Sequence, residues 1–210
     1  TIGSITYLSR NLGQMKKNII AGFNISCVGD DRAYSYLPSR QEDSLADRVA
    51  KHILTHLHPD FVTYSWLDRG SDERQYCSPG IDLPVASVMR TRYGAYPEYH
   101  TSLDNLDLVT ESGLNGAYHV LKKCLEVIEM NVIPKTSILA EPQMGKRGLY
   151  PTLSSLNSSV KISSNMMHIL TYCDGKISLL DIANKIKCPI WELIDICSLL
   201  EKNNIISIKH

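Results

Sequence analysis

Hydrophobic and polar positions change their spacing several times along the 210-residue chain. An apolar run over residues 18–28 ends at the turn Gly29-Asp30-Asp31, and two similar runs occupy residues 61–66 and 83–90. Short apolar runs bounded by turn residues predict buried strands. Between the first two runs, Ser44 precedes apolar residues at helical spacing and Pro59 follows them. This pattern predicts a helix that begins after a Ser44 cap and ends before the proline.

A longer helix is predicted further along, where apolar residues recur on one face of a helical repeat. They are Leu114, Ala117, Tyr118, Leu121, Cys124, Leu125 and Ile128. Predicted strands and helices therefore alternate over residues 1–150. Alternation of this kind is typical of a layered α/β fold with a largely parallel sheet.

The composition changes over residues 145–159, where Gly and Ser become frequent, and this change predicts a linker. Beyond it, helical patterns at residues 166–172, 179–186 and after Pro189 precede an apolar strand at residues 205–208. That order predicts a winged helix. We therefore expect two domains, residues 1–150 and residues 151–210.

Charge and composition exclude several classes of protein. The 22 basic and 22 acidic residues give a net charge of zero, so no electrostatic field attracts nucleic acid or anionic membrane. The third helix of the winged helix carries Glu192, Asp195 and Glu201, where a DNA-reading helix needs Lys and Arg. We therefore expect this unit to contact another protein or to pack on the larger domain, and not to bind nucleic acid. No apolar run approaches the roughly 20 residues of a membrane span.

The cysteines and most histidines favour an ordinary reduced protein. The 6 cysteines are scattered without a Cys-x-x-Cys pair, which predicts free thiols and a cytoplasmic location. Cys27 and Cys124 lie in apolar runs and are expected in the core. His52 and His56 share a helix face, but no Glu follows the first His, so we expect a solvated face and not a zinc site.

Candidate chemistry gathers around the predicted strand at residues 83–90. A polar loop from Arg69 to Gly80 precedes this strand, and Tyr99-His100-Thr101 with Asp104 follows it. In α/β proteins, sites form at the ends of such strands, so His100 is a candidate metal ligand. Arg69 and Arg74 have two interpretations. In the first, their guanidinium groups recognise a substrate carboxylate. In the second, they hold the loop together.

Three of these segments resemble the C-terminal half of zinc-dependent aminopeptidases of the di-zinc exopeptidase superfamily. They are Ser71-Asp72, the run from Gly80 to Val85, and Tyr99-His100-Thr101 with Asp104. The runs at residues 70–80 and 145–151 are also similar to a bacterial group of aminopeptidase-like proteins with a winged helix after this domain. The resemblance spans nearly the whole chain. It implies a three-layer fold with a mixed, mostly parallel sheet.

The resemblance also implies roles for single residues. His100 matches the last histidine ligand, and Asp72 matches a catalytic aspartate beside the metals. Tyr99 matches an aromatic residue that lines the substrate pocket, and Arg69, Arg74 and Tyr76 are further candidates for substrate binding. Ser26 stands where the superfamily has an aspartate ligand, so Asp30 is the nearest substitute and Asp31 the second choice. Glu73 likewise stands where the family has a histidine.

The activity implied is metal-dependent hydrolysis of a peptide or small amide with two zinc ions. The catalytic glutamate and the first ligands are expected before Thr1, so this chain alone is expected to be inactive. An alternative is a non-catalytic binding or scaffold module that uses the winged helix for protein contact, which Ser26 supports. A transcriptional regulator is a third interpretation. The sequence does not decide whether the protein forms a homo-oligomer.

Overall fold

The structure is a computed structural model of the chain, and it describes residues 2–149 and 156–209. The chain folds into two compact units, residues 1–128 and 129–210. Each unit is described by itself.

The first unit contains a small mixed sheet with the strand order β1-β4-β2-β3. The strands are β1 (Gly22–Asn24), β2 (Ser35–Leu37), β3 (Val62–Thr63) and β4 (Val85–Met89). β1 pairs with β4 and β2 pairs with β3 in parallel, whereas β2 and β4 are antiparallel. The prediction of an α/β fold is confirmed.

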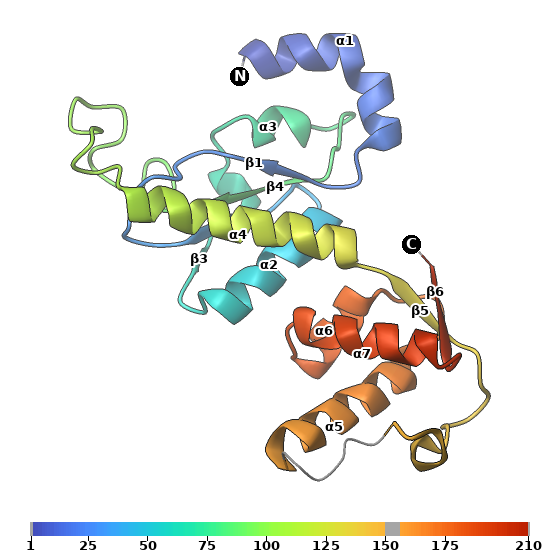
Figure 1. The fold of residues 1–210 in the computed structure, drawn as a ribbon. Helices are drawn as coiled ribbons and strands as arrows, with labels where there is room; N and C mark the ends of the chain where they lie inside the picture. The colour runs from blue at the N-terminus through green and yellow to red at the C-terminus, as the bar shows by residue number, and fades with distance from the viewer. Residues whose placement is uncertain (1, 150–155, 210) are drawn as a thin grey trace. The chain divides into compact units, whose positions relative to one another are not determined.

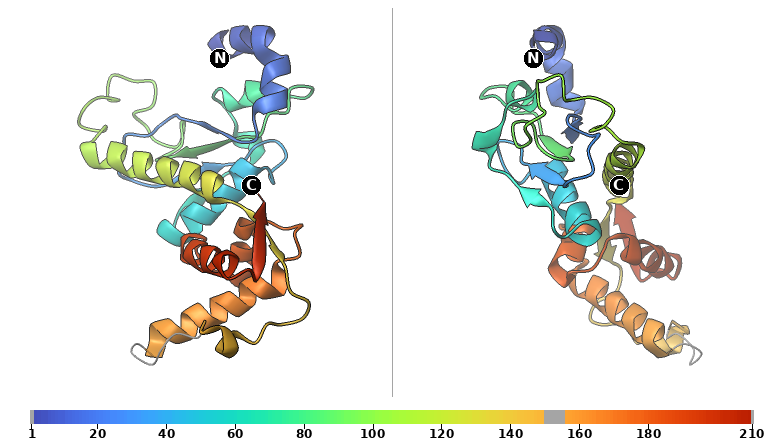
Figure 2. Two further views of the ribbon diagram at one scale, coloured as in Figure 1. Left: turned by 45° about the vertical axis from the view of Figure 1, so that its right-hand side comes forward. Right: turned by 90° about the vertical axis from the view of Figure 1, so that its left-hand side faces the viewer.

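Helices lie on both sides of this sheet. They are α1 (Ile2–Asn18), α2 (Leu45–Leu57), α3 (Glu73–Tyr76) and α4 (Glu111–Met130), with a 3₁₀ turn η1 at Trp66–Asp68. Figures 1 and 2 show α1 and α3 on one side of the strands and α2 and α4 on the other. Among the described residues, no helix combines the length and apolar character needed to cross a membrane.

The helix predicted after Ser44 is confirmed as α2. The Ser44 side chain accepts from the backbone of Asp47, and the Asp47 carboxylate accepts from the Ser44 backbone at 2.9 Å. This reciprocal cap satisfies two N–H groups that the helix itself cannot satisfy. Buried Asp47 also accepts from the Tyr36 hydroxyl at 2.7 Å, which ties the cap to β2.

The strand at residues 83–90 is confirmed as β4, while the other two strands predicted in this unit were too long. Only Gly22–Asn24 of residues 18–28 forms a strand, because α1 runs to Asn18 and Cys27 turns the chain with a left-handed φ of 48°. Only Val62–Thr63 of residues 61–66 is a strand, since Ser65 caps η1. β2 was not predicted, because three residues are too few for a period to show.

The long helix is confirmed as α4, but its apolar residues form two faces instead of one. Ala117, Val120 and Cys124 are buried, whereas Leu114, Tyr118 and Leu125 are exposed. Its N-terminal half approaches the preceding turn closely, because a Cβ at Gly113 would lie 2.0 Å from the Gly29 carbonyl oxygen. The three exposed residues belong to the predicted stripe, so only part of that stripe packs into the core of the described unit.

The second unit has the predicted order of a winged helix. It contains β5 (Ile133–Thr136), η2 (Met144–Arg147), α5 (Leu156–Tyr172), α6 (Leu179–Ile186), α7 (Trp191–Lys202) and β6 (Ile206–Lys209). β5 and β6 form an antiparallel pair. This pairing places β5 in the second compact unit, which begins at residue 129. The predicted domain boundary at 150/151 lies outside the described residues and stays a prediction.

Cysteines and histidines partly follow expectation. All six cysteines are free, and five are buried, as predicted for Cys124. Cys27 is instead half-buried. The expectation of a solvated face was wrong for His52, which is 3% exposed. Its ring meets the His56 ring edge-on, with the two ring centroids 4.7 Å apart.

Candidate functional site

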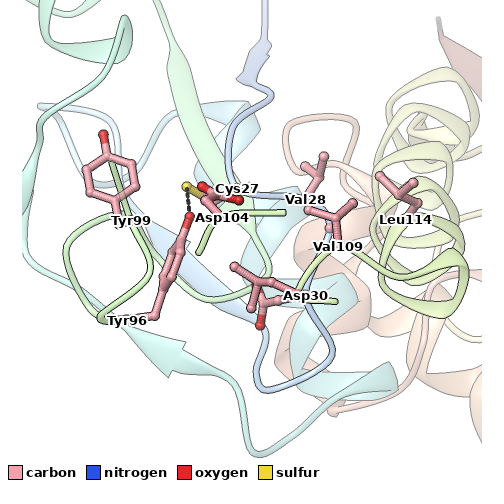
Figure 3. A pocket seen from close by; sticks show the side chains of 10 residues that line it. Cys27, Val28, Asp30, Tyr96, Tyr99, Asp104, Val109 and Leu114 are labelled. Carbon is pink, nitrogen blue, oxygen red and sulfur yellow. Dashed lines mark hydrogen bonds between the residues drawn. The ribbon is translucent and has the colours of Figure 1, made fainter. Parts of the chain in front are cut away.

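A cleft of about 250 Å³ lies beyond the carboxyl ends of β1 and β4. The turn after β1 supplies Cys27 and Asp30, and the loop after β4 supplies Tyr96, Tyr99 and Asp104 (Figure 3). Because β1 and β4 are parallel neighbours, the segments that follow them emerge at one edge of the sheet. These five residues define what we call the tyrosine cleft.

Cys27 and Tyr96 form one wall of the tyrosine cleft. Figure 3 shows the Tyr96 hydroxyl directed at the Cys27 sulfur, to which it donates at 3.7 Å. Burial raises the pKa of Tyr96, and the hydrogen bond with Cys27 raises it further. The phenol is therefore a neutral O–H donor at physiological pH.

Asp30 lies at the base of the cleft and is 5% exposed. One carboxylate oxygen accepts from the Arg32 N–H at 3.0 Å and from the Thr91 hydroxyl. The other accepts from the Thr91 N–H at 2.9 Å. Both oxygens are thus engaged in joining the turn after β1 to the end of β4. The carboxylate holds the two segments of the cleft together.

Tyr99 lines the cleft, and His100 lies beside it on the exposed side of the loop. The two rings stack with their centroids 3.9 Å apart. His100 has a left-handed φ of 59°, a conformation that costs energy for a residue with a Cβ. Because His100 is exposed, its imidazole is accessible from outside the described fold.

A charged pair fixes the start of the same loop. The Arg32 guanidinium donates to both oxygens of Glu98, at 2.7 and 2.9 Å. This fork lowers the pKa of Glu98 to about 2. The pair connects the turn after β1 to the segment that carries Tyr99 and His100.

The predicted residues Asp72 and Tyr76 lie in a different place. They line a groove of about 430 Å³ beside β1, together with Met15, Ile19 and Leu83 among others. The Ser4 hydroxyl donates to Asp72 at 3.3 Å, and burial together with nearby Asp72 raises the pKa of Tyr76. The structure therefore brings Asp30 and Tyr99 together but gives Asp72 a separate groove.

Glu73 holds the loop before α3 in place. One of its oxygens accepts from the N–H groups of Gly70 and Ser71, at 2.8 and 2.9 Å, and from the Tyr93 hydroxyl at 2.8 Å. The other accepts from the Asn24 amide at 2.9 Å. Glu73 is fully buried, so this carboxylate is a structural anchor.

The two arginines of this loop are exposed. The Arg69 guanidinium lies 5.2 Å from the Trp66 ring centroid and donates to the Trp66 carbonyl at 3.4 Å. These local contacts favour the interpretation of Arg69 as a residue that holds its loop. Arg74 projects from α3, and neither arginine lines the tyrosine cleft.

Within residues 2–149 and 156–209, no group of three or more His, Cys, Asp or Glu side chains could hold a metal ion. The oxygens of Asp30 already accept three hydrogen bonds, and His100 is exposed. These residues do not fit a zinc site by themselves, because such a site needs at least three protein ligands.

Sequence reasoning missed Cys27 and Tyr96 as residues of the cleft. The apolar neighbours of Cys27 predict a core position, and the left-handed turn that brings it to the surface leaves no mark in the sequence. Tyr96 lies in the loop Gly94-Ala95-Tyr96-Pro97, and an aromatic residue between Gly and Pro was the only signal there.

Comparison with known proteins gives related chains in Clostridium acetobutylicum. A protein named for polysaccharide biosynthesis with an aminopeptidase-like domain is 40% identical over 190 residues, which cover 88% of this chain and 42% of the relative. A crystal structure named as a peptidase is 35% identical, with a TM-score of 0.88 over 100% of this chain and 46% of that chain. The chain thus spans less than half the length of either relative.

A weaker structural match covers 60% of this chain and 30% of an aminopeptidase from Aneurinibacillus sp. strain AM-1. Its identity is 17% and its TM-score 0.49, so we base no conclusion on it. Residues 131–208 match a winged helix-turn-helix model, which agrees with the fold of the second unit. Residues 1–131 match the model described as "Domain of unknown function (DUF4910)". This match covers more than half of the chain, and the chain therefore belongs to the DUF4910 family.

Proposed function

We propose that this chain is part of an aminopeptidase-like hydrolase that acts on peptide or small amide bonds. The observation that carries the proposal is its 40% identity to a protein named for an aminopeptidase-like domain. The structural likeness to a protein named as a peptidase supports it. The three-layer, zinc-exopeptidase-like architecture belongs to the same proposal, because less than half of either relative is represented here.

The tyrosine cleft is the part of the substrate site that this chain contributes. Tyr99 offers an aromatic wall for a substrate side chain, and the neutral Tyr96 hydroxyl lies beside it. The Asp104 carboxylate also lines the cleft, where it can accept a hydrogen bond from the free amine of a peptide (Figure 3). The exposed His100 ring continues this rim outward.

Zinc remains a proposal for the longer protein. When bound, two divalent ions would supply Lewis-acid chemistry and a metal-activated water. His100 can offer one ligand, whereas Asp30 is committed to its three hydrogen bonds. The remaining ligands and the carboxylate base must then come from outside residues 1–210.

The experiment compares the 210-residue chain with the natural polypeptide in its full length. Both are assayed on amino-acid amides and short peptides, and their metal content is measured. We expect turnover and about two bound divalent ions per molecule only for the longer protein. Metal-dependent turnover by the 210-residue chain would contradict the proposal, and so would an inactive, metal-free longer protein.

A specific observation also favours the second candidate, a non-catalytic binding or scaffold module. Ser26 occupies the position where the superfamily has a carboxylate ligand, and the carboxylate of nearby Asp30 serves the fold. In that case the tyrosine cleft would bind a peptide without cleaving it, and the winged helix would contact protein. Peptide binding by a full-length protein that lacks both metal and turnover would support this alternative.

A further inference from the structure

The tyrosine cleft combines an aromatic corner with a carboxylate. The rings of Tyr96 and Tyr99 have their centroids 5.7 Å apart and their planes at 72°, so they form two sides of a corner. Asp104 lines the same cleft (Figure 3). The faces of aromatic rings carry partial negative charge, and proteins use such rings to bind ammonium and guanidinium groups.

The Asp104 carboxylate is free to receive a ligand. In the described part of the chain it accepts no hydrogen bond and forms no ion pair, and only its backbone N–H is engaged, with the Thr101 carbonyl at 3.2 Å. The residue is also exposed. Since an unpaired carboxylate accepts from several donors at once, it can bind the charged end of a ligand strongly.

The electrostatic character of the cleft favours a cation. Asp30, at its base, accepts three hydrogen bonds, but all three donors are neutral N–H and O–H groups. The negative charge of Asp30 is therefore not cancelled by a paired cation. Of the described residues that line the cleft, none is Lys, Arg or His. The cleft thus presents two carboxylates and no basic group of its own.

The other wall of the cleft is apolar. It is formed by Val28, Leu108, Val109 and Leu114, and Figure 3 shows Leu114 on the side away from the Tyr99 ring. A side chain with a long aliphatic portion and a charged end matches this division. The volume of about 250 Å³ is below that of clefts that hold drug-sized ligands, so one such side chain is a fitting occupant.

We propose that the tyrosine cleft is a subsite for a basic side chain of the substrate, lysine or arginine. The aliphatic portion lies along the apolar wall, and the cationic end lies in the corner of Tyr96 and Tyr99 and donates to Asp104. This inference rests on the proposed function, because it assigns the substrate residue that enters this part of the site. The amine that faces Asp104 is then a side-chain amine and not the α-amine of the peptide.

Calorimetric binding to the full natural polypeptide tests the proposal without any need for turnover. Nα-acetyl-lysinamide and Nα-acetyl-norleucinamide differ only by the side-chain ammonium group, and we expect the lysine compound to bind at least about 10-fold more tightly. Equal affinities would overturn the proposal. So would a gain in affinity for norleucinamide, which has a free α-amine, without a gain for the acetylated lysine compound. Preference for lysine without any turnover would retain the subsite and contradict the hydrolase, whereas turnover without this preference would do the reverse.

Variants locate the preference within the cleft. Asp104→Asn should reduce it to less than about 2-fold and leave the affinity for Nα-acetyl-norleucinamide unchanged. Asp107→Asn is the matched control, since Asp107 is exposed on the same loop and does not line the cleft, and it should keep the full preference. Tyr99→Leu should lower the preference about 3-fold, whereas Tyr99→Phe keeps the ring and should not. A lysine preference that survives Asp104→Asn would overturn the proposal, provided that the melting temperature shows the variant to be folded.

Discussion

The two loops that flank β4 differ in how they are held. The loop before α3 is anchored from inside by the fully buried Glu73, which accepts four hydrogen bonds. The loop after β4 is anchored at its start by the Arg32–Glu98 pair on the surface, and residues 101–107 beyond it are exposed. Both loops carry residues that the sequence marked as catalytic or metal-binding.

The difference separates residues that build the site from residues that remain available to it. Glu73 and Asp30 are acidic residues near the expected metal positions, but their oxygens are occupied by the protein's own donors. His100 and Tyr99 lie on the other loop, where the imidazole is exposed and the phenol lines the cleft. A charged residue in a signature motif can therefore serve the fold as readily as the reaction.

The largest expected effect comes from removing the internal anchor. Glu73→Ala removes an acceptor that serves four donors in a buried site. The Ser71 N–H and the Tyr93 hydroxyl lose the bonds they make to it, while the Gly70 N–H keeps only the Tyr93 oxygen and the Asn24 amide only Ser87. We expect the free energy of unfolding to fall by about 3–4 kcal/mol. Chemical denaturation of the 210-residue chain measures this.

The control for this anchor is Glu129→Gln at an exposed position of α4, which should change stability by less than about 0.5 kcal/mol. A loss below about 1 kcal/mol for Glu73→Ala would show that the loop does not depend on the carboxylate. The loop before α3 would then be held no more firmly than the loop after β4.

Asp30 should show the next largest effect. Asp30→Asn keeps the shape but replaces one oxygen by a donor that faces the donors of Thr91 or Arg32. We expect a loss of about 2 kcal/mol in unfolding free energy, independent of added zinc. Exposed Asp60→Asn serves as the control. Should zinc stabilise the wild type and not the variant, Asp30 would be a metal ligand after all.

The parts of the fold that could be predicted are those where local chemistry decides the outcome. Ser44 and Asp47 form a reciprocal cap within four residues, and Val49 and Ile53 repeat at helical spacing, so α2 is encoded locally. β4 could be predicted because a buried strand of five residues must be apolar throughout. The other three strands of the same sheet have two or three residues each and depend on their neighbours in space.

The candidate site could be predicted only in part, for a related reason. The sequence placed Tyr99 and Asp30 near the ends of strands, and both line the cleft. It did not reveal that Asp30 and Glu73 would be saturated by hydrogen bonds, because their donors Thr91, Asn24 and Tyr93 lie 20 to 61 positions away. The left-handed turn at Cys27 could not be predicted, because the apolar residues around it indicate a continuous buried strand.

Acid should weaken the exposed anchor of the second loop. The folded-state pKa of Glu98 is lowered to about 2 by Arg32, against about 4.3 in an unfolded chain. The stabilisation is therefore present above about pH 4.3 and is lost as the pH falls through about 2. Carboxyl titration by NMR measures the pKa of Glu98, and Arg32→Gln should return it towards its ordinary value. An unshifted Glu98 in the wild type would mean that the pair does not form in solution.

The smallest effect on stability is expected at His100, which is proposed as a metal ligand of the longer protein. His100→Ala removes an exposed ring stacked on Tyr99, so the unfolding free energy should change by less than about 0.5 kcal/mol. His52→Ala is the matched control, because that ring is 3% exposed within α2 and its loss should cost about 2–3 kcal/mol. In the full-length protein, His100→Ala should also lower metal content or peptide affinity, whereas His52→Ala should act through stability alone. If His100→Ala destabilises the fold as much as His52→Ala does, the imidazole serves the loop and not a ligand, and the contrast between the two loops disappears.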